Sequence, residues 1–251
     1  MADNDFNVKI SVITVTFNSS ATVRDTIDSV LSQTYAPYEY IVVDGASTDD
    51  TVAVASSYRS KFEEKGIKFT LLSEPDNGMY DAMNKGLKLS SGEIIGIINS
   101  DDWYEPDALE TVAKSYAESP FDLFYADLRL IRPDGRSFVK RSRYRRYATS
   151  RDWNHPTTFI TKEIYDANPY RTDTLHDDYD LILRIRRDNI RIRVVNKIVA
   201  NFRMNGVSHS RSIKAAVSSI KMKYGIYRQN GYGRYYIIEP LLEEVGKLII
   251  G

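Results

Sequence analysis

The segment "VKISVITVTFNSSATVRDTIDSVLSQTYAPYEYIVVDG", residues 8–45, contains the pattern that decides the fold. Its first ten residues are mostly apolar and β-branched, which predicts a buried strand. After the polar turn "NSS", the residues Val23, Ile27, Val30 and Leu31 follow at helical spacing. The segment ends in a second apolar run, "YEYIVVDG". A strand, a helix and a strand in this order predict two parallel strands joined by a crossover helix.

The same alternation continues to residue 98. Residues 47–65 predict a second helix, with Ser47 or Thr48 as its N-cap and acids in its first turn. A third strand, "IKFTLLSE", a short helix, "MYDAMNKGLKLS", and a fourth strand, "EIIGII", follow. Alternating strands and helices of this kind form a mostly parallel sheet that is flanked by helices on both faces.

The pattern changes in the second half of the chain. Residues 105–119 predict a helix, and two runs of strand-like residues around "RPDG" predict a hairpin. Residues 177–189 predict a helix, and residues 190–203 a strand with alternating apolar residues. We therefore expect an α/β fold with a single Rossmann-like domain over residues 1–209, followed by a C-terminal helical extension over residues 210–251.

The charge of the chain is balanced overall but divided between its halves. The net charge of the 251 residues is zero, yet residues 1–128 carry 9 Lys+Arg against 22 Asp+Glu, and residues 129–251 carry 25 against 12. The basic half fits an anionic partner, and attraction between the halves explains the division equally well. The absence of cysteine, of a long apolar run and of a signal peptide favours a cytoplasmic protein. Peripheral contact at the inner face of the membrane is an open alternative.

Polar residues follow each of the first four predicted strands. Ligands of open parallel sheets bind at this carboxyl edge, so Asp44, Asp101 and Asp102 should lie near one another. The adjacent pair Asp101–Asp102 has two interpretations. It caps the next helix, which is the commoner role on the residues alone, or it binds a hard divalent cation such as Mg²⁺ or Mn²⁺. A dinucleotide site, a P-loop and a zinc site are not expected, because their sequence patterns are missing.

Five segments in the order "VITVTFN", "YIVVDGASTDDT", "EPDNGMYDAMNKG", "IINSDDWYEPDAL" and "HDDYDLILRI" closely resemble family 2 glycosyltransferases of the nucleotide-sugar-binding A-fold. The resemblance covers about residues 8–205, and the "VVDGASTDDT" and "DNGMYDAMNKG" stretches are its specific parts. It implies an enzyme that transfers a sugar from a nucleotide diphosphate sugar to an acceptor hydroxyl with inversion. The sequence departs from the family at Met83, where many members have arginine, and the neighbouring Lys85 is a candidate substitute.

The resemblance also implies a set of residues that bind the nucleotide sugar. Asp44 would accept a hydrogen bond from a ring N–H of the base, although a turn ahead of Ser47 would also explain this aspartate. The residues expected around the donor are Thr14, Thr16, Asn18, Asp44, Gly45, Gly78, Asp81, Asn84, Lys85, Asn99 and Ser100.

The metal site of the family is usually written D-x-D, and here Asn99 stands at its first position. We expect Asp101 and Asp102 to bind Mn²⁺ or Mg²⁺, through one ligand or both, with His209 as a weaker candidate for a third ligand. The metal would stabilise the negative charge that develops on the leaving nucleoside diphosphate.

The family's catalytic base lies in an acidic pair before a helix, and Asp178 matches it here. Acids at a helix N-terminus also interact favourably with the helix dipole, so only the resemblance singles out Asp178, and we expect Asp180 to be structural. Trp153 and His155, in "WNHPTTFI", are expected on the acceptor side.

The implied partners are a nucleotide sugar, with UDP favoured, and a glycan or lipid-linked acceptor in bacterial polysaccharide or glycolipid assembly. The predicted helix over residues 210–229 has an apolar stripe. We expect this stripe to pack on the domain or on a second copy of the chain in a homodimer, and contact with an acidic membrane is the alternative. The basic run from Arg136 to Arg146 is expected to be a solvated loop, and nucleic acid is not the expected partner. A sugar nucleotidylyltransferase and a non-enzymatic binding module are the alternative functions.

Overall fold

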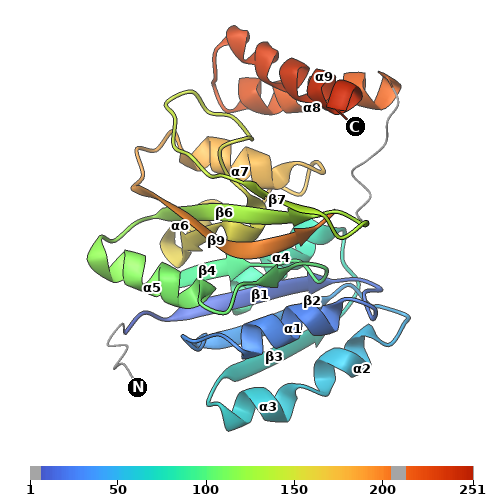
Figure 1. Ribbon diagram of the computed structural model, residues 1–251, viewed down its shortest axis with the longest axis vertical. Helices are drawn as coiled ribbons and strands as arrows, with labels where there is room; N and C mark the ends of the chain where they lie inside the picture. Colours follow the sequence, from blue (N-terminus) through green and yellow to red (C-terminus); the bar gives the residue numbers. More distant parts are fainter. Residues whose placement is uncertain (1–6, 205–212, 251) are drawn as a thin grey trace.

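The computed structural model describes residues 7–204 and 213–250. Within these ranges the strands form one sheet in the order β3-β2-β1-β4-β8-β6-β9-β5, with β7 added beside β6 (Figure 1). The strands are β1 (Ile10–Thr16), β2 (Glu39–Asp44), β3 (Lys68–Ser73), β4 (Ile94–Ile97), β5 (Trp103–Tyr104), β6 (Leu123–Ile131), β7 (Ser137–Lys140), β8 (Phe159–Thr161) and β9 (Ile192–Arg203).

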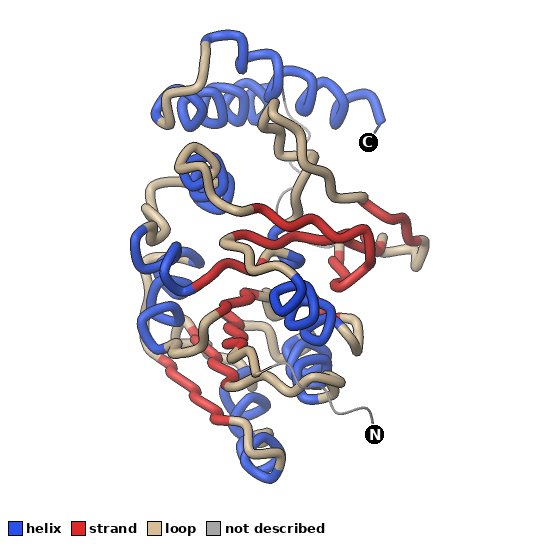
Figure 2. Tube along the Cα trace, turned by 90° about the vertical axis from the view of Figure 1, so that its left-hand side faces the viewer, coloured by secondary structure: helices blue, strands red, loops and turns tan. Residues whose placement is uncertain are grey.

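The helices flank this sheet, and the last two lie beyond it at one end of the molecule (Figures 1 and 2). They are α1 (Val23–Leu31), α2 (Thr51–Ser56), α3 (Arg59–Glu64), α4 (Met79–Leu89), α5 (Ala108–Glu118), α6 (Lys162–Ala167), α7 (Asp177–Ile185), α8 (Ile213–Gln229) and α9 (Ile238–Ile250), with short 3₁₀ turns η1 (His155–Thr157) and η2 (Arg234–Ile237). No helix in the described ranges is long and apolar enough to cross a membrane.

The first four strands confirm the predicted parallel sheet. β1 pairs in parallel with β2 and with β4, and β2 pairs in parallel with β3, so their carboxyl ends share one edge. The sheet becomes mixed where β8 joins β4 and β6 in antiparallel pairing. The predicted hairpin is also present, since β6 and β7 pair antiparallel around the turn at residues 132–135.

Two apolar cores lie on opposite faces of the sheet because the side chains of a strand alternate. Ile10 and Val12 of β1 belong to the core under α1, α3 and α5, whereas Ile13 and Val15 belong to the core under α4, α6 and α7. The second core continues through Tyr227 of α8, so the C-terminal helices extend the side of the sheet that holds α7.

One segment that was predicted as a single helix is interrupted. Residues 47–65 form two short helices rather than one, because tight turns at Ser57 and Tyr58 interrupt the hydrogen-bond ladder. Tyr58 at the break and Phe62 in α3 both belong to the core. The proposed domain boundary at residue 209 lies outside the described residues, so the division of the chain stays a prediction.

Candidate active site

The carboxyl ends of β1, β2 and β4 are tied together by hydrogen bonds. The amide of Asn18, after β1, donates to Ser47 Oγ at 2.8 Å, and the amide of Ser19 donates to Thr51 Oγ1 at 2.8 Å. Ser100, after β4, donates from its hydroxyl to Ser19 Oγ at 2.9 Å. These bonds bring the predicted residues Asn18 and Ser100 to one edge. Asn18 also has a positive φ of 48°, which asparagine tolerates better than most residues.

Asp44 is fully buried at this edge, and its carboxylate is already occupied by groups of the chain. One oxygen accepts the Ser47 amide at 2.9 Å and the Ser73 hydroxyl at 2.7 Å, and the other accepts the Ser47 hydroxyl. A carboxylate offers about four acceptor positions, so three are filled. The turn ahead of Ser47 is therefore present, and a bond to a nucleotide base would use the remaining position.

The loop after β3 packs closely against Gly45. A Cβ atom at Gly45 would lie 2.5 Å from Asp76 Oδ2, so only glycine admits the Asp76 carboxylate here. The other oxygen of Asp76 accepts the amide of Gly78 at 2.8 Å, which holds Gly78 at a φ of 110° just before α4. Gly45 and Gly78 thus shape one loop beside the end of β2.

The predicted donor residues on α4 mostly stabilise this loop and its neighbours. Asp81 accepts the Asn77 amide at 3.0 Å, and Lys85 forms an ion pair with Glu74 at 2.9 Å. Asn84 exchanges two hydrogen bonds with the backbone of Tyr170, at 2.8 and 3.0 Å. Both polar atoms of Asn84 are therefore engaged away from the sheet edge.

The acidic pair after β4 divides into one inward and one half-exposed carboxylate. Asp102 is fully buried, and its Oδ1 accepts the Arg203 amide at 3.1 Å, while Oδ2 has no partner within residues 7–204 and 213–250. Burial, reinforced by the neighbouring Asp101 charge, raises the pKa of Asp102 to about 8. Burial also raises the pKa of Asp101, against the attraction of Arg203. The helix-cap interpretation is wrong, because α5 begins at Ala108, six residues after Asp102, and Asp107 stands at its N-cap position.

The residues around this pair fit a divalent cation that is shared with a substrate. In the described residues no cluster of three or more acidic, histidine or cysteine side chains surrounds a metal position. Mg²⁺ and similar ions are often held by one or two carboxylates together with substrate phosphates. Among the described residues, the buried oxygens Asp102 Oδ2 and Asn99 Oδ1 have no hydrogen-bond partner, and with the Asp101 carboxylate they are oxygen groups of the kind that such an ion takes. His209, the other candidate ligand, lies outside the described residues.

A second acidic group lies at the start of α7. Asp178 is half-buried, and Tyr80 of α4 donates its hydroxyl to Asp178 Oδ1 at 2.8 Å. Asp177 is buried and accepts the amides of Asp173 and Thr174 at 2.8 and 3.0 Å, so it closes the preceding loop. Asp180 pairs with Arg171 at 2.9 Å, a structural contact of the kind expected for it. Asp178, by contrast, lines a small pocket.

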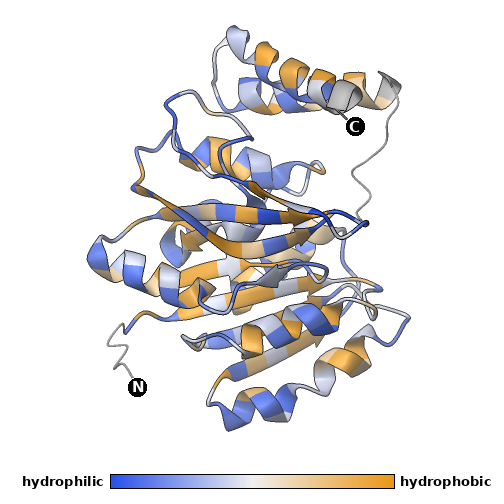
Figure 3. Ribbon diagram, viewed as in Figure 1, coloured by the Kyte–Doolittle hydropathy of each residue, from blue (hydrophilic) through white to orange (hydrophobic). Residues whose placement is uncertain are grey.

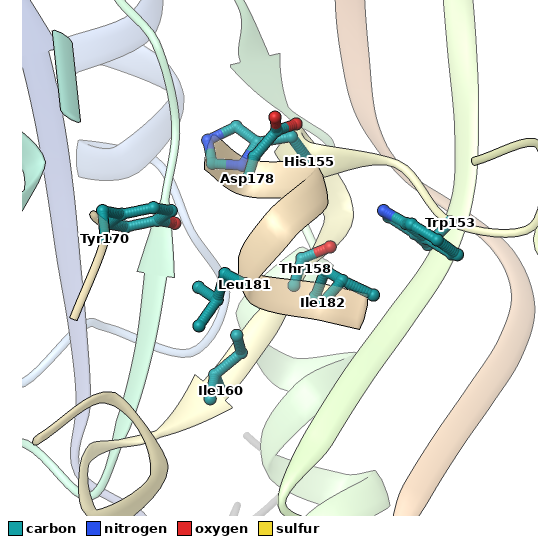
Figure 4. Close-up of a pocket in the computed structure, with 8 residues that line it drawn as sticks. All are labelled: Trp153, His155, Thr158, Ile160, Tyr170, Asp178, Leu181 and Ile182. Atoms are coloured by element: carbon teal, nitrogen blue, oxygen red, sulfur yellow. The ribbon is translucent and has the colours of Figure 1, made fainter. Parts of the chain in front are cut away.

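That pocket has room for about one water molecule, with a volume of about 10 Å³. Figure 4 shows Asp178 beside His155 at one end and the Trp153 ring on the wall. Burial lowers the pKa of His155, although the nearby Asp178 carboxylate opposes the shift. His155 Nε2 has no hydrogen-bond partner in the part of the chain that the structure describes. The structure therefore brings the candidate base, Asp178, together with Trp153 and His155, the two residues that were expected on the acceptor side.

Two predicted donor residues do not face open space. Thr14 is fully buried and accepts a hydrogen bond from Tyr40 at 3.0 Å within the core, because its position on β1 points toward α1. Thr16 is buried at the end of the strand, and none of the described residues forms a hydrogen bond with its hydroxyl.

The basic run was expected to be a solvated loop, and this is right only in part. Its arginines, Arg136, Arg141, Arg143, Arg145 and Arg146, are exposed. Lys140 instead ends β7, and its amine donates to the carbonyl oxygens of Ser150 and Trp153.

Two residues of the site escaped the sequence analysis. Tyr80 lies inside the "DNGMYDAMNKG" stretch, but no spacing rule connects it to Asp178, which is 98 residues away. Arg203 supplies the amide bonded to Asp102 and pairs with Asp25 at 2.7 Å. The strand prediction for residues 190–203 could not indicate that its last residue meets the β4 end.

Comparison with known proteins identifies related sequences. The sequence profile described as "Glycosyl transferase family 2" matches residues 11–178. A Mycobacterium bovis protein named "PGL/p-HBAD biosynthesis glycosyltransferase" is 37% identical over 120 residues, which is 47% of this chain and 46% of that protein. The Streptococcus pneumoniae glycosyltransferase GlyA is 32% identical over 115 residues, 46% of this chain and 16% of GlyA. These matches thus span less than half of the curated relatives.

Two solved structures share the fold at low sequence identity. S. aureus TarS 1-349 in complex with UDP-GlcNAc has a TM-score of 0.69 and 20% identity, covering 95% of this chain and 72% of that one. The mannosyltransferase PcManGT from Pyrobaculum calidifontis, in complex with GDP-Man and Mn²⁺, has a TM-score of 0.67 and 19% identity, covering 98% and 71%.

Proposed function

The chain belongs to glycosyl transferase family 2, and on that premise we propose that it moves one sugar from a nucleoside diphosphate sugar to an acceptor hydroxyl with inversion. The observation that carries the proposal is the bond between Tyr80 and Asp178. Tyr80 lies in the segment that the family resemblance assigns to the donor, and Asp178 lines the small pocket. This bond joins the proposed donor side to the proposed acceptor side.

Asp178 acts in this proposal as the general base. Its carboxylate takes the proton of the acceptor hydroxyl while that oxygen attacks the anomeric carbon. The bond from the anomeric carbon to the diphosphate oxygen breaks in the same step, and the nucleoside diphosphate leaves with the electron pair. The Tyr80 hydroxyl fixes the direction of Asp178 Oδ1, so that the other oxygen is free to accept the proton. A single displacement of this kind inverts the anomeric configuration.

The donor lies in this proposal along the edge formed by the ends of β1, β2 and β4. Asp44 and Asn18 contact the nucleoside, and the loop containing Gly45 and Gly78 covers it. Asp101 and Asp102 would hold Mn²⁺ or Mg²⁺, and the ion would supply positive charge that stabilises the leaving diphosphate. The solved complex of PcManGT with GDP-Man and Mn²⁺ supports the proposal that this fold binds a metal.

We propose a UDP-sugar as the donor and a glycan or lipid-linked acceptor in polysaccharide or glycolipid assembly. TarS in complex with UDP-GlcNAc supports uracil as the base of the donor nucleotide. The M. bovis relative, whose name refers to PGL/p-HBAD biosynthesis, supports the acceptor class. PcManGT holds GDP-Man on the same fold, so the choice of UDP rests on the family resemblance.

The proposal is tested by thermal unfolding with UDP, GDP and dTDP and their sugars, each with and without Mn²⁺. The correct donor at saturating excess should raise the free energy of unfolding by roughly 2–4 kcal/mol, and more with Mn²⁺ than without. The same donor should then release nucleoside diphosphate on turnover. Consumption of a nucleoside triphosphate with release of pyrophosphate would instead identify a nucleotidylyltransferase. Stabilisation by no nucleotide at all would contradict the proposal.

A further inference from the structure

His155 lines the small pocket beside Asp178, and its Nε2 atom is buried without a hydrogen-bond partner among the described residues. Leaving a buried nitrogen unpaired costs free energy, so such atoms in proteins usually bond to ordered water or to a ligand. Figure 4 shows the His155 ring and the Asp178 carboxylate at the same end of this pocket. A partner for Nε2 therefore has a place beside the candidate base.

The pocket suits a single water molecule. Its volume of about 10 Å³ corresponds to one water, and a buried water needs two to four polar partners. Asp178, His155 and Thr158 line the pocket and carry polar groups that can serve. The remaining wall is aromatic or apolar and includes Ile160 of β8 with Leu181 and Ile182 of α7. β4, which pairs with β8, is also apolar, and Figure 3 shows such residues in orange. One water that bridges Asp178 and His155 thus has the space and the partners it needs.

The imidazole of His155 is suited to receive a proton. Burial lowers its pKa, with the Asp178 carboxylate opposing the shift, so the ring is neutral near pH 7 and has one nitrogen free to accept. The ordinary pKa of an imidazole, about 6.5, lies above that of an aspartate, about 3.9, so a protonated aspartate tends to give its proton to a neutral imidazole. His155 as a residue is only half-buried, which leaves the proton a route to solvent.

We propose that His155 receives, through one water in the pocket, the proton that Asp178 takes from the acceptor hydroxyl. After the sugar transfer Asp178 is a carboxylic acid, and it must lose its proton before it can act again. The water accepts that proton and gives one of its own to Nε2, so Asp178 regains its charge, the water is restored and His155 becomes an imidazolium. The imidazolium then loses a proton to solvent. We call this path the His155 relay. His155 acts in it through Asp178 and is not itself the base, and the relay rests on the proposed function.

The other ionisable groups near the pocket do not compete for this role. Tyr170 lines the pocket and Tyr80 bonds to Asp178, but burial raises the pKa of both phenols, so they stay protonated. Lys140 bonds through its amine to two backbone carbonyls, and burial lowers its pKa to about 8, which is above the range in which His155 titrates. Among the described residues, Asp178 therefore supplies the charge that acts on His155.

The first test follows the imidazole signals of the full chain by NMR and needs no substrate. The chain has three histidines, so the His155 signal can be assigned by replacing each of them in turn. We expect Asp178→Asn to lower the pKa of His155, because the carboxylate raises it in the wild type. Asp180→Asn is the matched control, since it removes the same charge two residues further along α7, from a carboxylate that pairs with Arg171 at 2.9 Å. This control should leave the pKa of His155 at its wild-type value.

The second test measures release of nucleoside diphosphate at saturating donor. The amide of His155→Gln can hydrogen-bond to the water but cannot take up a proton near pH 7, so kcat should fall roughly tenfold or more while nucleotide affinity is unchanged. His155→Ala leaves space for a small base, and imidazole in the buffer should therefore restore part of its kcat. Pyrazole has the same ring size but is a much weaker base, so it should restore none.

A wild-type kcat in His155→Gln, or equal restoration by imidazole and pyrazole, would overturn the His155 relay. A His155 pKa that does not respond to Asp178→Asn would overturn it as well, and this titration stays decisive if a His155 variant loses its fold. Midpoints of thermal unfolding show which variants are folded. If the wild type released nucleoside diphosphate from no nucleotide sugar, the proposed transfer would fail and the relay with it, a result distinct from normal turnover that does not depend on His155.

Discussion

Replacement of Tyr80 by phenylalanine tests how the candidate base is positioned. The change removes the hydroxyl that donates to Asp178 Oδ1 at 2.8 Å and keeps the ring, which stacks on Tyr170 at 5.2 Å between centroids. A hydrogen bond to a charged group contributes about 1.5–3 kcal/mol. If that contribution orients Asp178 in the transition state, kcat should fall roughly 10- to 100-fold, since each 1.36 kcal/mol is tenfold in rate.

The assay is release of nucleoside diphosphate under saturating donor, together with nucleotide affinity from titration. We expect kcat of Tyr80→Phe to fall while the Kd for the nucleotide stays at its wild-type value, because Tyr80 is a positioning residue for the base. Tyr170→Phe is the matched control, since it removes a hydroxyl from the other ring of the same stacked pair. The Tyr170 hydroxyl lies 3.5 Å from the Tyr165 hydroxyl and is not the group that donates to Asp178. Equal losses in the two variants, or a wild-type kcat in Tyr80→Phe, would refute the reasoning.

Three further predictions address other parts of the molecule. Asp101→Asn should abolish most of the extra stabilisation that Mn²⁺ gives to the nucleotide complex in thermal unfolding, and leave nucleotide binding without metal unchanged. Gly45→Ala should displace the Asp76 carboxylate, 2.5 Å from the added Cβ, and weaken nucleotide binding by about 1 kcal/mol, roughly fivefold in Kd. Burial lowers the pKa of Lys140 to about 8 in the folded chain, so the unfolded chain binds more protons between about pH 8 and 10.5. Wild type should therefore gain stability over Lys140→Met as pH rises through that window, by up to about 3 kcal/mol in urea unfolding, whereas a difference independent of pH would contradict this sign.

The sequence predicted the first half of the sheet well because its signals are local. The apolar run ending at Asp44 and the helical spacing from Val23 to Leu31 each lie within a single element. Parallel pairing of β1, β2 and β4 then follows from their alternation with helices. The short strands β5 and β8 were missed, because two or three residues carry no periodicity and pair only with distant segments.

The sequence predicted which edge of the sheet holds the candidate site residues, but not the hydrogen bonds that these residues form. The edge of the sheet follows from topology, so Asn18, Asp44 and Ser100 could be placed together in advance. The occupation of Asp44 by Ser47 and Ser73, and the inward orientation of Asp102 toward Arg203, depend on packing between segments far apart in sequence. No pattern within one segment carries that information, and the resemblance to a family names positions without giving their hydrogen bonds.

The orientation of α9 illustrates the same limit. Its sequence, "IEPLLEEVGKLII", reads as a very apolar amphipathic segment that any core could bury. Only the partners of its glutamates, Arg151 and Lys223, show that the acidic side is the inner one. Arg151 lies 88 residues before Glu239, so local spacing could not reveal the pair.

Turnover by Asp178→Asn tests whether Asp178 is the general base of the proposed transfer. The measurement is UDP released from the UDP-sugar that stabilises the protein most, with binding of that nucleotide measured on the same sample. We expect unchanged nucleotide affinity and a turnover rate lower by roughly 10²–10⁴-fold, the usual contribution of a general base. Wild-type turnover by Asp178→Asn with intact binding would show that Asp178 is not the base, because the proton of the acceptor would then leave by another route.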